Sequence, residues 1–472
     1  MKMRNQFSLF DCLSPVDYRY RDEEVAEYLS EEAFVRYKLE VEYMLVGQLL
    51  REGICSPEVA EEIWKTHGQI TAEEVYAEEE KIRHDIRALV NCIRKRVSDE
   101  AKPFVHMGAT SYDIVETANA ARYKGVIFKV LLPALLNLEK ILIEIALREA
   151  ETVQIGRTHG QHAVPITFGF ALAGYVSRLG KSIVSLKKLA QELCGKFSGA
   201  CGAYNASSLL AKNPEEFELE IVSKLDLAAA EISTQIAPPE TLTRIFSEVV
   251  IIYGILANLS DDMRHLQRTE IGEVGEEFKA GQVGSSTMPQ KRNPINFENV
   301  KSLWKVVMPR MMTVFMDQIS EHQRDLTNSA SARTYGELID YLVDSVNRLA
   351  RTMKKLKVDG ANLEKNFFAT GDMFLAEPLY ILLAKAGYPD AHEKIHKLTL
   401  LAQEKKMPLA EAFRKDEELW PYIPKLPSEW QELIEETSSE IKRIRMRKIY
   451  TGLAAKKARK TAKRWKRELK ID

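Results

Sequence analysis

The sequence predicts an all-α protein, because apolar residues recur at helical spacing over long stretches and no extended run alternates between apolar and polar residues. Between residues 126 and 147, apolar residues recur every three or four positions, which places them on one face of a helix. Pro133 interrupts this pattern and should kink the helix or mark its first turn. Four similar patterns follow, at 168–193, 243–278, 298–319 and 335–356.

Helices of this length bury their apolar faces best against one another. We therefore expect a central long-helix bundle at 109–358, flanked by two smaller helical domains at 1–108 and 359–472. Unusual polar and glycine-containing residues gather between the long helices, at 157–165, 198–205 and 281–294. Such segments at the ends of a bundle are where we expect a functional site.

The composition is that of an ordinary globular protein with room for more than one domain. The chain has 472 residues, of which 45% are hydrophobic and 29% charged, and its net charge is −1, which gives no bias toward nucleic acid or acidic membranes. No run of 18 apolar residues and no N-terminal secretory pattern occurs, so neither a membrane span nor a signal peptide is expected. Five cysteines without CxxC spacing predict neither disulfides nor a zinc site and fit a cytoplasmic protein.

The C-terminal end is strongly basic. Nine Lys or Arg residues occur within 456–470, with Glu468 as the single acid. The spacing predicts a basic helix whose apolar contacts are Leu453 and Trp465. A solvated helix face is the favoured interpretation, and a nucleic-acid patch is the alternative.

The segment 281–299 combines several groups that suit an anionic ligand. Gly281 and Gly284 precede Ser285 and Ser286, so hydroxyls and backbone N–H groups are available. Lys291, Arg292 and Asn293 follow, and Pro294 is expected to open a helix. By residue types alone, an ordinary polar loop is an equally good interpretation.

The letters SSTMPQKRNPINFEN, at 285–299, resemble the signature SSxMPxKxNPxxxE of the fumarase/aspartase superfamily. The resemblance implies a helical-bundle homotetramer that breaks a bond by β-elimination. It implies that Ser285 is the general base on Cβ of a succinyl group and that Lys291 and Asn293 hold its carboxylates, with Ser286 hydrogen-bonded nearby. A serine base requires that the loop amides and Lys291 stabilise its alkoxide.

A second segment, GRTHGQHAVPITFG at 156–169, contains His159 and His162. Two histidines are too few ligands for a metal site, so no metal is expected. A histidine can protonate a departing nitrogen because its pKa lies near neutrality. The resemblance assigns this acid role to His159, paired with the carboxylate of Glu298, and leaves His162 a structural role.

Further residues are those that would hold a nucleotide. Arginine forks suit phosphate oxygens, and the chain resembles adenylosuccinate lyases in its SPVDYRY, KIRHDIRA, HMGATSYD, STQIAPPE and HQRDLTNSASAR segments. In that family Thr110 and Ser111 would hold a succinyl carboxylate, while His106 stays open between a core position and a phosphate contact. The other substrate-binding residues implied by the resemblance are Arg19, Tyr20, Arg83, His84, Asp85, Gln235, Arg292, Asn299, Arg324, Ser329 and Arg333.

Within the superfamily, the motifs favour the adenylosuccinate lyase family. The implied reaction removes fumarate from adenylosuccinate to give AMP, and from the succinylated aminoimidazole carboxamide ribotide, SAICAR, to give AICAR. No cofactor is implied, and the implied partners are a small nucleotide substrate and other copies of the chain. Gln290 departs from the histidine that many adenylosuccinate lyases carry, which keeps an argininosuccinate lyase-type enzyme as the alternative. A non-catalytic structural member of the superfamily is the second alternative.

Overall fold

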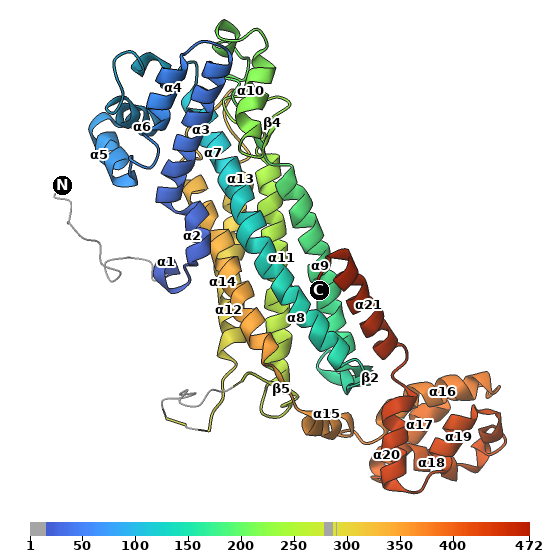
Figure 1. Ribbon diagram of the computed structural model, residues 1–472. Coiled ribbons are helices and arrows are strands. Elements are labelled where there is room, and N and C mark those ends of the chain that lie inside the picture. The colour runs from blue at the N-terminus through green and yellow to red at the C-terminus, as the bar shows by residue number, and fades with distance from the viewer. Residues whose placement is uncertain (1–15, 278–286, 289) are drawn as a thin grey trace. The chain divides into compact units, whose positions relative to one another are not determined.

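The computed structural model describes residues 16–277, 287–288 and 290–472 (Figure 1). Helices dominate these residues, and the strands form three two-stranded sheets, which confirms the predicted all-α class. The chain divides into two compact units: unit 1 is Met1–Asn137, Lys181–Ala257 and Asn299–Leu349, and unit 2 is Leu138–Gly180, Asn258–Glu298 and Ala350–Asp472. The three-part division at residues 108 and 358 stays a prediction.

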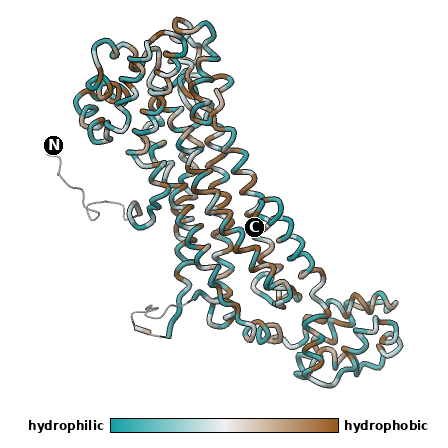
Figure 2. Tube along the Cα trace, in the orientation of Figure 1, coloured by the Kyte–Doolittle hydropathy of each residue, from teal (hydrophilic) through white to brown (hydrophobic). Residues whose placement is uncertain are grey.

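Five helices have residues in both units, and they correspond to the five predicted patterns. They are α8 (Leu132–Arg148), α9 (Phe168–Gln191), α11 (Glu240–Leu266), α12 (Ile295–Val307) and α14 (Tyr335–Lys354). Hydrophobic and hydrophilic residues alternate around these helices, as Figure 2 shows. That pattern lets each helix bury one face while the other stays polar.

The remaining elements of unit 1 are mostly short helices. In chain order they are α1 (Val16–Arg19), α2 (Glu23–Leu29), α3 (Glu31–Arg51), α4 (Pro57–Trp64), α5 (Ala72–Ile82), α6 (Asp85–Arg94), η2 (Lys102–Phe104), α7 (Ser111–Val126), η3 (Ile127–Leu131), β3 (Cys194–Gly195), η4 (Ser207–Leu209), α10 (Pro214–Ser223), β4 (Ala228–Ala229), η5 (Met308–Arg310), α13 (Met311–Met316) and η6 (Ser331–Thr334).

Aromatic contacts hold the long helices of unit 1 together. The ring of Phe246 on α11 lies 5.6 Å from that of Tyr123 on α7 and 5.1 Å from that of Tyr335. The hydroxyl of the fully buried Tyr253 donates a hydrogen bond to the carbonyl of Tyr341 on α14, at 3.0 Å. Because the buried polar group of Tyr253 has an acceptor, this large side chain stabilises the packing of α11 on α14.

Pro133 accounts for an irregular turn in the first long pattern. Residues Ile127–Leu131 form a π-helical turn between α7 and α8, and Pro133 lies in the first turn of α8. Proline has no N–H to donate to the carbonyl four residues earlier, and its ring crowds that carbonyl, so a wider turn is favoured there. The prediction that Pro133 marks a first turn is confirmed.

Unit 2 combines the bundle residues with a C-terminal group of helices. Its further elements are β1 (Val153–Thr158), β2 (Gln161–Thr167), β5 (Val274–Gly275), β6 (Lys357–Val358), α15 (Gly360–Phe367), η7 (Met373–Leu375), α16 (Ala376–Lys385), α17 (Ala391–Glu404), α18 (Leu409–Lys415), η8 (Glu417–Leu419), η9 (Ile423–Lys425), α19 (Ser428–Glu435), α20 (Ser439–Ile449) and α21 (Ala454–Glu468). A core that includes Phe367, Leu383, Leu398, Phe413 and Leu433 lies between α15 and α20.

Several expectations about element limits were wrong. The single helix expected at 298–319 is divided, because α12 ends at Val307 and the turn η5, which contains Pro309, separates it from α13. The helix expected at 243–278 ends at Leu266, because the chain turns at Gly272, whose φ is 59°, and then pairs β5 with β6. The segment 157–165, expected to be a loop between helices, belongs instead to an antiparallel hairpin of β1 and β2. Its strands are short and include Gly156 and Pro165, so the alternation that marks a strand is weak.

The basic C-terminal segment is helical, as predicted, and forms α21. Three alanines spaced by four residues and Trp465 make its buried face, whereas Leu453 is 63% exposed, so of the two predicted apolar contacts only Trp465 is one. A Cβ atom added to Gly180 on α9 would lie 2.5 Å from the Trp465 ring. The ring therefore packs directly on the backbone of α9.

One described helix, α11, is long and apolar enough to cross a membrane, and 56% of the relevant window is buried. Core helices of bundles have the same property, and the contacts of Phe246 and Tyr253 are those of a core helix.

Candidate active site

His159 lies at the tip of the β1–β2 hairpin. Thr158 pairs with Gln161, so His159 and Gly160 are the two residues of the turn. Both have positive φ, at 53° and 73°, which is characteristic of the type I′ turn that matches the twist of paired strands. The His159 side chain is exposed. The hairpin thus presents an imidazole on a short, defined turn.

A buried ion pair anchors this hairpin. Arg157 on β1 donates to Glu273 through Nη2, at 2.5 Å, and through Nη1, at 3.2 Å. The Glu273 side chain is fully buried and also accepts hydrogen bonds from Gln154, at 2.7 Å, and from Asn366 on α15, at 2.9 Å. A buried carboxylate is stable only with such partners. Glu273 therefore joins the hairpin to the segment after α11 and to α15.

His162 lies on β2 of the same hairpin. Its Nδ1 atom is buried and has no hydrogen-bond partner among the residues that the structure describes. Burial, and then the charge of Arg157, lowers the pKa of His162, so the neutral form is favoured. In the described ranges, no group of three His, Cys, Asp or Glu side chains could hold a metal ion.

The start of α12 is fixed by a carboxylate from another segment. Glu276 accepts hydrogen bonds from the backbone N–H of Asn296, at 2.9 Å, and of Phe297, at 3.1 Å. Burial raises the pKa of Glu276. These bonds satisfy two N–H groups that a helix start otherwise leaves without acceptors. Pro294 was expected to be the first helical residue, and it immediately precedes Ile295, where α12 begins.

The residues of the signature loop are only partly within the described structure. Ser285 and Ser286, the expected base and its neighbour, lie outside the described residues. Lys291, Arg292 and Glu298 are exposed, and Asn293 is half-buried. Glu298 lies in the first turn of α12. In the described part of this single chain no hydrogen bond joins it to His159, so their pairing stays a prediction.

Tyr20 and Asn299 are two predicted binding residues that the fold brings into contact. The Asn299 side-chain amide donates a hydrogen bond to the Tyr20 hydroxyl, at 3.0 Å, although 279 residues separate them. Arg19, the last residue of α1, is exposed. The N-terminal Arg-Tyr pair is therefore held beside α12.

A second group of predicted residues gathers around Arg324. Its guanidinium donates to the Tyr112 hydroxyl and lies 4.1 Å from the centre of that ring. The backbone N–H of Gln235 donates to the carbonyl of Gln323, at 3.2 Å. Thr110 caps α7, where Ser111 is the first residue, and its N–H donates to Asp113 at 2.9 Å. Four residues assigned to one ligand thus lie on neighbouring segments.

Two residues of this group have no role in the sequence-based prediction. Tyr112 supports Arg324, and Glu116, four residues later on α7, accepts a hydrogen bond from the N–H of Ala237 at 3.3 Å. Burial raises the pKa of Glu116, and the charge of Arg324 opposes that rise. The sequence did contain a signal for both residues. Tyr112 lies inside the HMGATSYD segment, and Glu116, four residues later, is expected on the same helix face.

The KIRHD residues have structural partners within the chain. Arg83 ends α5 with φ 59°, and the Nδ1 of His84 accepts from the N–H of Arg87, at 3.2 Å, as the cap of α6. Asp85 forms an ion pair with Lys38 at 3.2 Å. With its Nδ1 used as acceptor, His84 can offer only Nε2–H to a ligand. The side chain of Arg83, the residue that caps the C-terminal end of α5, is exposed.

Three other predicted residues have simpler surroundings. Arg333 is exposed and lies 3.9 Å from Glu31, and Ser329 is exposed in the segment after α13. The Nδ1 of His106 lies 2.6 Å from the buried Glu42. Burial alone would lower the pKa of His106, but the charge of Glu42 and its hydrogen bond outweigh burial and raise it. His106 is therefore the partner of the buried Glu42 carboxylate in this structure.

Comparison with known proteins agrees with these motifs. A lyase family model matches residues 31–308, and a model described as adenylosuccinate lyase C-terminal matches residues 320–422. Among solved structures, the chain is similar to the 3-carboxy-cis,cis-muconate lactonizing enzyme of Pseudomonas putida, with a TM-score of 0.81, 23% identity, and coverage of 96% of this chain and 99% of that one. A fumarate lyase of Mesorhizobium sp. BNC1 has the same TM-score with 21% identity, covering 94% and 98%. These two likenesses show the fold.

Relatives at higher identity are adenylosuccinate lyases. That of Pyrococcus abyssi is 35% identical over 87% of this chain and 92% of its own length. Those of Archaeoglobus fulgidus and Methanocaldococcus jannaschii are each 33% identical, the first covering 87% of this chain and 91% of its own length and the second 94% of each. The chain belongs to the adenylosuccinate lyase family.

Proposed function

We propose that this protein eliminates fumarate from adenylosuccinate to give AMP, and from SAICAR to give AICAR, in purine nucleotide synthesis. The observation that carries the proposal is the 33–35% identity with three archaeal adenylosuccinate lyases over 87–94% of the chain. In both substrates an N–H group is bonded to the succinyl carbon, as an amine attached to the ring in adenylosuccinate and as a carboxamide in SAICAR, so one base, one acid and one carboxylate clamp serve both.

The reaction breaks the bond between nitrogen and the succinyl carbon. Ser285 takes the proton from Cβ, the electron pair forms the double bond of fumarate, and His159 gives a proton to the leaving nitrogen. Donors on the adjacent carboxylate make that Cβ proton more acidic, which is the role proposed for Lys291 and Asn293. Glu298 would hold the His159 imidazole in the tautomer that can donate. No cofactor takes part.

The remaining residues bind the substrate. Thr110, Ser111 and Ser286 are assigned to the succinyl group, and Gln235 to the body of the substrate. Phosphate and ribose are assigned to the basic and polar residues Arg19, Tyr20, Arg83, His84, Asp85, Arg292, Asn299, Arg324, Ser329 and Arg333. The Arg324–Tyr112 and Asn299–Tyr20 contacts support this assignment, because they fix side chains before any ligand arrives.

Self-association into a homotetramer with shared active sites is part of the proposal. Exposed apolar side chains follow one another along α13 and just after it, where Met312, Met316 and Ile319 are 63%, 66% and 77% exposed. A patch of this kind is typical of a surface that another chain covers. In the described part of one chain, no hydrogen bond or ion pair joins His159 to Glu298, and we propose that other copies complete their surroundings. A cytoplasmic location is proposed with it.

The test is to mix the purified protein with adenylosuccinate and to follow AMP and fumarate, with argininosuccinate in a parallel reaction. Product from adenylosuccinate alone supports the proposal. Product from argininosuccinate alone would make the chain an argininosuccinate lyase-type enzyme. No product from either, with a folded tetramer by light scattering, would favour a non-catalytic member of the superfamily.

A further inference from the structure

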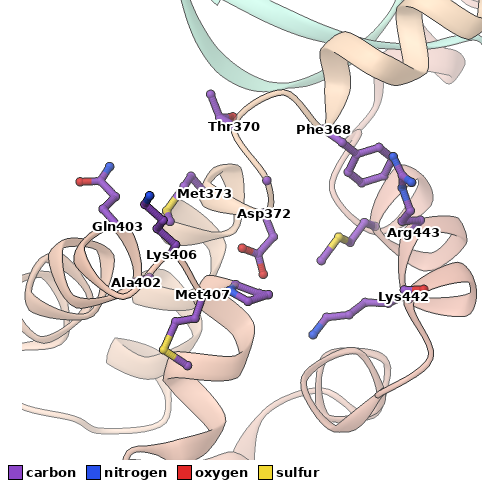
Figure 3. Close-up of a pocket in the computed structure, with 14 residues that line it drawn as sticks. Phe368, Thr370, Asp372, Met373, Ala402, Gln403, Lys406, Met407, Lys442 and Arg443 are labelled. Atoms are coloured by element: carbon purple, nitrogen blue, oxygen red, sulfur yellow. The ribbon is translucent and has the colours of Figure 1, made fainter.

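A cavity of about 510 Å³ lies within unit 2 (Figure 3). Its walls come from the residues after α15, the end of α17 with the turn into α18, and α20. This volume is in the range of pockets that hold small molecules. The question is which molecule its side chains would select.

Three cations line the cavity, namely Lys406, Lys442 and Arg443. Among the described residues, none of the three has a carboxylate within ion-pair distance. Neighbouring cations do: Lys394 lies 2.8 Å from Asp416, and Lys415 lies 2.7 Å from Glu411. Within the described chain, the three cations that line this cavity therefore lack the acidic partners that these neighbours have.

The single acid of the lining, Asp372, does not neutralise them. It is 4% exposed, and its two oxygens accept hydrogen bonds from the backbone N–H of Leu409, at 2.7 Å, and of Ala410, at 3.0 Å. Figure 3 shows Lys442 extending from α20 toward the side of the cavity that carries Asp372. Burial lowers the pKa of Lys442, Arg414 adds to that shift, and Asp372, Glu411 and Glu436 oppose it. An anion in the cavity would stabilise this ammonium group.

The rest of the lining is apolar and adaptable. The guanidinium of Arg443 lies 4.4 Å from the centre of the Phe368 ring. Met373, Met407 and Met446 supply flexible thioether side chains, which fit closely around flat rings. A ligand that suits both the cations and the apolar side chains of the lining has an aromatic ring and one negatively charged group.

We propose that this cavity binds a small aromatic oxyanion, a flat ring that carries one phosphate or carboxylate group. Lys442, assisted by Lys406, binds the oxyanion, and Phe368 and the three methionines contact the ring. The site is independent of the proposed elimination reaction, because no residue assigned to that reaction lines it.

The test uses methionine methyl groups as local reporters in the full-length protein. The chain carries ¹³C-methyl methionine, and Met→Leu variants assign the signals of Met373, Met407 and Met446. Phenyl phosphate and benzoate are titrated as probes. Inorganic phosphate, which has the anionic group without the ring, and phenol, which has the ring without the anionic group, are the controls. We expect saturable shifts of these three signals with phenyl phosphate or benzoate, and weaker ones with either control.

Lys442→Gln should weaken the binding of the probe about tenfold or more, since it removes a charge-assisted hydrogen bond to the oxyanion. The control is Lys405→Gln, which removes the same charge from an exposed position outside the lining and should leave the affinity unchanged. Unmoved methionine signals, equal effects of the two variants, or equal binding of phenol would each overturn the proposal. Because the readout is not turnover, its failure is separate from a failure of the proposed reaction.

Discussion

Arg157 and Glu273 form an ion pair near the tip of the hairpin that carries His159, with Nη2 and Oε1 2.5 Å apart and the carboxylate fully buried. Removing one member of a buried pair leaves the other charge without compensation, which costs about 3–5 kcal/mol. Glu273→Gln should therefore lower the free energy of unfolding by roughly this amount. Urea denaturation followed by circular dichroism measures the change.

The control for Glu273 is Glu270→Gln. Glu270 forms an ion pair with Arg268 in which both side chains are mostly exposed, and such pairs contribute little. No measurable change is expected in this variant. If both variants unfolded at the same urea concentration as the parent, the buried pair would not anchor the hairpin.

His159→Asn separates the proposed proton donor from the fold. Asparagine adopts positive φ more readily than most residues, so the turn with Gly160 should persist. Loss of a general acid should lower kcat for adenylosuccinate by about 10²–10⁴-fold, with an unchanged melting temperature. His159→Val should lose both activity and stability, because a β-branched residue is strained at positive φ. Near-normal turnover by the asparagine variant would remove His159 from the mechanism.

Glu139 makes stability depend on pH. It lies on α8 with no exposure, neither carboxylate oxygen has a hydrogen-bond partner in the described ranges, and burial raises its pKa to about 9. The folded protein thus keeps a proton that the unfolded chain releases above its ordinary pKa of about 4.3. Stability from this group is present at low pH and decreases by about 1.4 kcal/mol per pH unit between those two values.

Glu139→Gln removes this titration. The free energy of unfolding of the variant, relative to the parent, should rise as the pH rises from 5 to 9. Urea denaturation of both proteins at several pH values measures the difference. A difference that does not vary with pH would contradict the buried, protonated carboxyl group.

Gly180 and Gly174 on α9 give opposite results when changed to alanine. A Cβ at Gly180 would lie 2.5 Å from the Trp465 ring, whereas a Cβ at the exposed Gly174 meets nothing within 4 Å. Gly174→Ala should stabilise by about 0.5–1 kcal/mol through helix propensity. Gly180→Ala should destabilise by about 1–3 kcal/mol through overpacking. Thermal unfolding distinguishes the two, and stabilisation by Gly180→Ala would show that α21 does not pack on α9 in this way.

The helices were predictable because their apolar periodicity is long and regular. The pattern at 168–193 became α9 with nearly the same limits, and that at 335–356 became α14. The hairpin was not predicted because its turn is His-Gly rather than the Asn-Gly that signals a hairpin, and because Pro165 lies within β2. The sequence pattern placed the end of α11 too far along the chain, because apolar residues continue at helical spacing after Leu266. In the structure this stretch leaves the helix, and Glu273 is buried in its ion pair with Arg157.

The sequence names candidate site residues, but it does not predict how the fold arranges them. A motif names Arg324 or Gln235, but it does not say that Tyr112 and Glu116 lie beside them, since those contacts join segments more than a hundred residues apart. His84 and Asp85 likewise have partners, at Arg87 and Lys38, that only the fold reveals.

The turn that holds His159 also restricts how this protein can evolve. Because the position requires positive φ, the residues it accepts without strain are glycine and short polar ones such as asparagine and aspartate. Histidine codons become asparagine or aspartate codons by a single nucleotide change. A descendant that keeps the scaffold but has lost the proposed proton donor is therefore one mutation away, which would be a direct genetic route from a catalyst to a structural protein.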